Sequence, residues 1–193
     1  MNSEPTLTGW IVRDVLIVLV FAAGLTAGSW WLSDGYGWIS GIIVSVPAFI
    51  ACYVVCYIVH EWGHYLGALL TGIRMPLGPY KGAFLGQFHI DHYDRRQYLW
   101  LSWGGDLGHL IVTAVAVALY LSFGGITLAA FAVGGIAFSI QSLAVDQPVI
   151  WKVTFGADIK EAAATGTTPQ VILKRTWQTW IPGALVLMAY QLV

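Results

Sequence analysis

Charged residues are scarce in this chain. Asp, Glu, Lys and Arg make up only 10% of its 193 residues, whereas 58% are apolar. A typical soluble domain carries about a quarter charged residues. The net charge of −1 gives no electrostatic basis for binding nucleic acid. This composition excludes an ordinary soluble domain and predicts an integral, multi-pass membrane protein that is surrounded by the lipid bilayer.

The first residues of the sequence show no cleavable-signal pattern, and its cysteines show no disulfide pattern. Its first fourteen residues do not combine a basic start, a short apolar run and a small-residue cleavage site, so the first apolar segment is predicted to be retained. The two cysteines, Cys52 and Cys56, lie four apart in an apolar stretch. They are interpreted as packed thiols, with a soft-metal role as the alternative. No linker, low-complexity tract or repeat divides residues 1–193, which predicts a single domain.

Five apolar segments approach or exceed the roughly twenty residues that a membrane-spanning helix needs. They cover residues 15–32, 39–70, 98–123, 126–151 and 177–193. The expected fold class is therefore an all-α membrane protein with about five transmembrane helices.

The longest connection, residues 74–97, separates the second and third segments. Its imperfect alternation of apolar and polar residues predicts either an edge strand or hairpin or an ordinary interfacial loop. Its polar residues are interpreted as a solvated face, with a second metal site as the alternative. They are His89, Asp91, His92 and Asp94.

The basic residues fall on one side of the predicted membrane. All nine lie near the N-terminus, in residues 74–97 or in residues 152–176, and none lies in the tight connections near residues 34–37 and 124–125. Cytoplasmic loops carry the excess of Lys and Arg. The N-terminus is therefore predicted to be cytoplasmic and, with five spans, the C-terminus to lie outside.

The second apolar segment contains the sequence His60-Glu61-Trp62-Gly63-His64. Two His four apart lie on one face of a helix, so both rings can reach one ion. Glu61 follows the first His and can act as an acid/base partner. Three ionisable groups at membrane depth are costly to bury, which favours a functional role. The pattern predicts a zinc site, and the alternative is a polar cluster that braces two helices.

Catalytic zinc usually has three protein ligands and one open position, so a third ligand is needed. Asp106 and His109 follow a Gly-rich stretch and are interpreted mainly as a cap and a packing contact. Asp146 precedes Pro148, which is expected to break the helix and unwind the backbone around it. Asp158 follows a Gly-led turn, where an Asp can also be a helix N-cap. Spacing leaves Asp146 and Asp158 both open.

These motifs resemble those of the site-2 proteases, which are intramembrane zinc metalloproteases. Residues 60–64 match the family's first motif in full, and residues 104–109 are similar to a degenerate Gly-Pro-x-x-Asn segment. The family's Asp-Gly motif is lacking. Gly156-Ala157-Asp158, with the run Ala163–Pro169 after it, is similar to divergent small bacterial members. The resemblance favours Asp158 over Asp146 as the third ligand.

The resemblance implies a transmembrane metalloprotease domain in the bacterial inner membrane. It would hydrolyse peptide bonds of a membrane-anchored protein substrate. Zinc would be held by His60, His64 and Asp158, with Glu61 as the general base. The oligomeric state is left open.

One family residue has no counterpart in this chain. The family carries an Asn near the zinc, but the only Asn here is Asn2. Gln141 is the candidate replacement as an amide donor. The alternative function is therefore a catalytically inactive, protease-like membrane scaffold that binds a partner protein. A metal transporter is disfavoured because the outer halves of the predicted helices have almost no polar residues.

Overall fold

A computed structural model describes residues 5–32, 37–80, 85–87, 92–166, 170, 173–174 and 177–178. The named helices of this part are α1 Leu7–Leu32, α2 Gly37–Leu70, α3 Arg95–Phe123, α4 Ile126–Thr154 and α5 Ile159–Gly166. No strand occurs among the described residues. The predicted all-α class is confirmed for this part of the chain.

Four helices are long and apolar enough to cross a membrane. Their candidate spans are Leu7–Gly28, Ile43–Leu70, Arg95–Phe123 and Ile126–Thr154. The chain thus has the architecture of a multi-pass membrane protein. The predicted fifth span, residues 177–193, lies outside the described residues except for its first two positions. The direction of the chain across the membrane stays a prediction.

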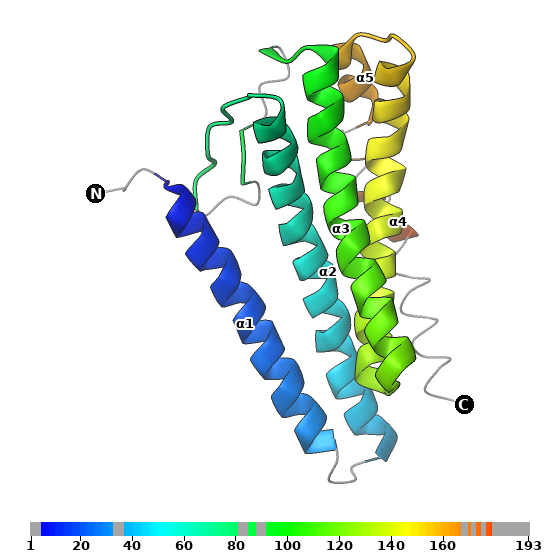
Figure 1. Ribbon diagram of the computed structural model, residues 1–193. Helices are drawn as coiled ribbons and strands as arrows, with labels where there is room; N and C mark the ends of the chain where they lie inside the picture. Colours follow the sequence, from blue (N-terminus) through cyan, green and yellow to red (C-terminus); the bar gives the residue numbers. More distant parts are fainter. Residues whose placement is uncertain are drawn as a thin grey trace.

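Helices α2, α3 and α4 form a bundle, and α1 leans against α2 at its side (Figure 1). The start of α1, the end of α2, the start of α3 and the connection from α4 to α5 lie at one end of the bundle (Figure 1). Basic residues of the helices and their connections belong to this end: Arg13, Arg74, Arg95, Arg96, Lys152 and Lys160. The fold therefore keeps these charges together.

Helices α2 and α3 approach each other closely at two glycines. A Cβ built on Gly63 would overlap the carbonyl group of Gly104, and a Cβ on Gly104 would overlap the carbonyl group of Gly63. Helices in a bilayer associate through such close backbone packing, because burial from water does not drive them together there. This contact holds the 60–64 turn of α2 against α3.

Two thiols lie in the core of the bundle. Cys52 and Cys56 are fully buried and free, and they pack with Ala116, Ala132 and Phe138. Cys56 Sγ lies 3.6 Å from Oγ1 of Thr113. The prediction of packed thiols without a disulfide between them is confirmed.

The connection between α2 and α3 folds back toward α1. Leu77 and Gly86 form an isolated antiparallel bridge, and the amide of Gly78 donates to the carbonyl of Leu85 at 2.8 Å. The indole of Trp10 on α1 donates to the Gly78 carbonyl at 3.0 Å. This pairing brings residues 85–87 over the 60–64 turn of α2.

The predicted polar cluster of this connection is only partly described. His89 and Asp91 lie outside the described residues, and His92 is exposed. Asp94 is the N-cap of α3: it accepts from the amide of Gln97 at 2.8 Å, and the Gln97 side chain accepts from the Asp94 amide at 3.0 Å. This capping box starts α3 at Arg95, three residues before the predicted start.

Candidate metal centre

The two histidines of residues 60–64 face each other on successive turns of α2. Their Nε2 atoms lie 2.9 Å apart. His64 Nδ1 lies 2.8 Å from the Leu101 carbonyl oxygen, which can only accept, so Nδ1 carries the proton and Nε2 presents its lone pair. Two nitrogen ligands of a tetrahedral zinc, each about 2.0–2.1 Å from the ion, lie roughly 3.3 Å apart. The observed separation is close to what one ion requires.

Glu61 lies beside this pair and is buried, with 6% of its surface exposed. Its ligand atom and those of His60 and His64 all lie within 4.8 Å of one another. The amide of Leu85, from the connection above α2, donates to Glu61 Oε2 at 3.3 Å. The carboxylate is therefore held next to the histidines by the connection that crosses over it.

Asp146 reaches the same histidine from α4. Its Oδ2 atom lies 3.8 Å from His60 Nε2 and accepts a hydrogen bond from Ser142 Oγ at 2.9 Å. Ser142 stands four residues earlier on the same helix, so the bond orients the carboxylate toward α2. Of the two carboxylates that the sequence left open, Asp146 is the one that contacts the histidine pair.

The predicted break at Pro148 does not occur. Helix α4 continues through Pro148 to Thr154. A proline removes one backbone hydrogen bond, but the next turns are held by burial, because Val149, Ile150 and Val153 are each at most 2% exposed. Asp146 therefore lies on a continuous helix, and the prediction that the backbone around Pro148 is unwound is wrong.

Asp158 does not join the histidine pair. It is exposed and precedes α5, where its Oδ1 atom accepts from the amides of Lys160 at 2.9 Å and Glu161 at 3.1 Å. These are the bonds of a helix N-cap. The structure therefore gives Asp158 the capping role that the sequence had also allowed.

Asp106 and His109 lie on α3 on the other side of His60. Both are fully buried. His109 Nδ1 lies 3.2 Å from His60 Nδ1, and Gln147 Nε2 donates to Asp106 Oδ2 at 2.6 Å. The ligand atoms of His60, Asp106 and His109 fall within 4.8 Å of one another. The predicted cap role of Asp106 is wrong, because α3 begins at Arg95 and Asp106 lies well inside the helix. The spacing of three residues places both side chains on one helix face.

Gln141, the proposed replacement for the missing family Asn, has a partner in the core. The hydroxyl of Tyr53 donates to its side-chain oxygen. Gln141 is partly buried on α4, five residues before Asp146. Its role as an amide donor stays a prediction.

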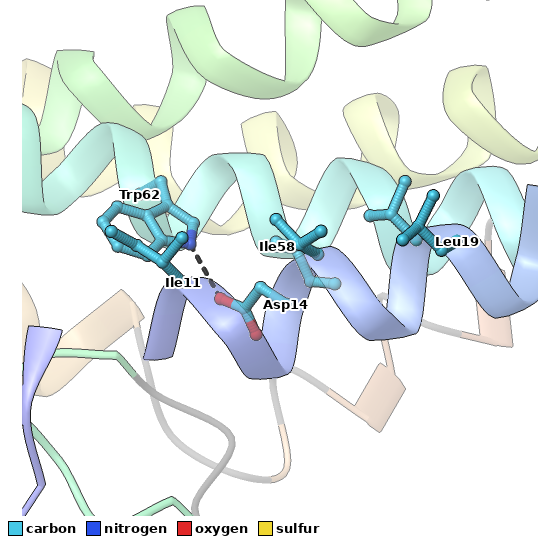
Figure 2. A pocket seen from close by; sticks show the side chains of 7 residues that line it. Ile11, Asp14, Leu19, Ile58 and Trp62 are labelled. Carbon is cyan, nitrogen blue, oxygen red and sulfur yellow. Dashed lines mark hydrogen bonds between the residues drawn. The ribbon is translucent and has the colours of Figure 1, made fainter. Parts of the chain in front are cut away.

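A cavity of about 330 Å³ lies between α1 and α2 (Figure 2). Aliphatic side chains line most of it, together with Asp14 and Trp62. The Trp62 indole donates to Asp14 Oδ2 at 2.7 Å, and Arg13 pairs with Asp14 Oδ1 at 2.6 Å. The sequence reasoning missed Asp14, whose signal is an acidic residue near the start of an apolar helix. This contact ties α1 to the residue that follows Glu61.

The donor set suits a divalent metal. Imidazole nitrogens and a carboxylate oxygen are typical zinc ligands, and two of them already converge. Comparison of the chain with models of protein families, with curated proteins and with solved structures found no match.

Proposed function

We propose that this chain is a zinc-dependent endopeptidase of the site-2 protease type, which cleaves membrane-anchored proteins. The observation that carries the proposal is the pair of Nε2 atoms of His60 and His64, 2.9 Å apart, with Glu61 buried beside them on a membrane-spanning helix. Burying ionisable side chains at membrane depth costs free energy, and such residues are generally functional.

His60, His64 and Asp146 are the residues that would hold the zinc. A zinc ion held there would polarise a carbonyl group and make a water acidic enough to lose a proton near neutral pH. Ser142 keeps the Asp146 carboxylate turned toward His60 by donating to it at 2.9 Å. The Leu101 carbonyl keeps the proton of His64 on Nδ1, so that Nε2 is available for the metal.

Glu61 would act as the general base and then as the general acid. It accepts a proton from the attacking water and passes it to the leaving amine. The Leu85 amide holds one carboxylate oxygen, which orients the group. The paired segments near Leu77 and Gly86 lie beside it, and an extended substrate chain could be held there by backbone hydrogen bonds.

A partner-binding scaffold without activity is the second candidate. One observation favours it: Asn2 is the only Asn of the chain, so the amide donor that the family carries near the zinc is missing. A scaffold would keep the helices and the histidine pair but would have no need of Glu61 as an acid/base.

The test is proteolysis in liposomes by the full chain, using membrane-anchored reporters that carry different transmembrane segments. Wild type should cut at least one reporter. Glu61→Gln should retain zinc but lose roughly 10²–10⁴-fold in rate, as expected on removal of a general base. Glu161→Gln is the matched control, because Glu161 is exposed on α5. Equal cleavage by Glu61→Gln would refute the mechanism. A zinc-loaded wild type that cuts none of the reporters would favour the scaffold.

A further inference from the structure

A second set of metal-ligating side chains surrounds the other edge of the His60 ring. His109 Nδ1 lies 3.2 Å from His60 Nδ1, a separation similar to that of the two Nε2 atoms on the opposite edge. Asp106 completes the group, with ligand atoms of all three residues within 4.8 Å. His60 is 8% exposed and the other two are fully buried. This is a closed site built from α2 and α3.

Two atoms of this group are buried without a hydrogen-bond partner. Among the described residues, Asp106 Oδ1 and His109 Nε2 are such atoms. Asp106 stands eleven residues into α3, which is about 17 Å along the helix. An unsatisfied polar group at this depth is costly, because lipid offers it no partner. A bound cation would give the Asp106 carboxylate the partner that it lacks.

One ion cannot serve both sets of ligands. The two nitrogens of an imidazole ring point in divergent directions, and here Nε2 of His60 faces His64 while Nδ1 faces His109. An ion held by Nε2 therefore lies on the opposite side of the ring from Asp106 and His109. The second group defines a separate position.

The region also offers a carboxylate to each set of ligands. Glu61, Asp106 and Asp146 lie on α2, α3 and α4. The sequence has no Lys or Arg in residues 97–151, which include Asp106 and Asp146. A carboxylate that is buried at this depth needs a proton or a cation as its partner, and a divalent cation at each position would supply one.

We propose that Asp106, His109 and Nδ1 of His60 form a second divalent-cation site, which shares His60 with the zinc site of the proposed function. The donor set of two imidazoles and one carboxylate suits zinc or cobalt. His60 bridges the two ions as an imidazolate, and its Nδ1 proton is released to water when the second ion binds. The inference of a shared ligand rests on the proposed function, whereas the α3 ligands stand on their own contacts.

The test counts metal ions per chain. The full chain, purified in detergent, is loaded with Zn²⁺, desalted and analysed for zinc and protein. Wild type should hold two ions and His64→Gln one. Asp106→Asn and His109→Gln should also hold one. His60→Gln should hold none, because it removes a ligand from both positions.

The matched control is Asp14→Asn. Asp14 is a buried carboxylate of α1 that Arg13 and Trp62 already satisfy, so this variant should keep two ions. Helical circular dichroism and gel filtration check that each variant is folded. Should His109→Gln fail to fold, the near-isosteric Asp106→Asn carries the comparison.

The outcomes separate the two proposals. One ion in wild type that survives Asp106→Asn but is lost in His64→Gln would overturn the second site and leave the proposed function standing. One ion that survives His64→Gln but is lost in Asp106→Asn would support the α3 site and overturn the proposed zinc site. No zinc in wild type would overturn both.

Discussion

Replacement of the two rival carboxylates by alanine should separate a metal ligand from a helix cap. Asp146 Oδ2 lies 3.8 Å from His60 Nε2, whereas the Asp158 carboxylate accepts from two backbone amides at the start of α5. Asp146→Ala should weaken zinc binding strongly, and Asp158→Ala should leave it unchanged. The two substitutions remove the same group, so each is the control for the other.

The expected magnitudes follow from these contacts. Loss of a residue that only supports a zinc ligand costs about 10–100-fold in affinity, so loss of Asp146 as a direct ligand should exceed that range. It also leaves the buried Ser142 hydroxyl without this acceptor, which costs about 1–3 kcal/mol of stability. Asp158→Ala should cost only the roughly 0.5–2 kcal/mol typical of a lost N-cap.

The assay is competition for zinc with a chromophoric chelator of known affinity, with each variant in detergent. Thermal unfolding of the zinc-free protein gives the stability of each variant separately. Zinc loss from Asp158→Ala at chelator concentrations that leave Asp146→Ala loaded would refute the assignment of Asp146. Small and equal effects would transfer the role to the α3 residues.

Three further results are expected. Gly105→Ala should reduce zinc affinity in the chelator assay, because its Cβ would lie 2.7 Å from both ring nitrogens of His64; unchanged affinity would show that the ring can move without consequence. A cysteine that replaces exposed His92, in a background without the native cysteines, should resist an impermeant reagent in intact cells, whereas one at exposed Phe123 should react; the reverse labelling would invert the predicted topology. Asp14→Ala removes the acceptor of an indole N–H between α1 and α2, so protease nicking of α1 in detergent should become faster, and equal nicking would show that this contact does not hold the helix.

Much of the fold could be predicted because its signals are local. Scarce charge and long apolar segments indicated membrane helices, and four of them are present among the described residues. Helix boundaries were less predictable. Helix α3 begins at Arg95, before the start that hydropathy predicts. Its N-cap Asp94 belongs to a capping box, which is polar and therefore does not raise the local hydropathy. Helix α4 passes through Pro148 because packing beyond the proline compensates for one lost hydrogen bond.

The sequence by itself determined the convergence of His60 and His64, because a spacing of four residues places two side chains on one helix face wherever the helix lies. It could not choose among the carboxylates, since that choice depends on which faces of α3 and α4 pack against α2. The close approach at Gly63 and Gly104 turns Asp106 and His109 toward His60, and the regular course of α4 brings Asp146 there as well. Asp158 matched a sequence pattern, but its carboxylate is bonded to the backbone amides of its own helix start. Tertiary packing alone decided which residues join the histidine pair, because ligands from different helices meet only through the contacts between those helices.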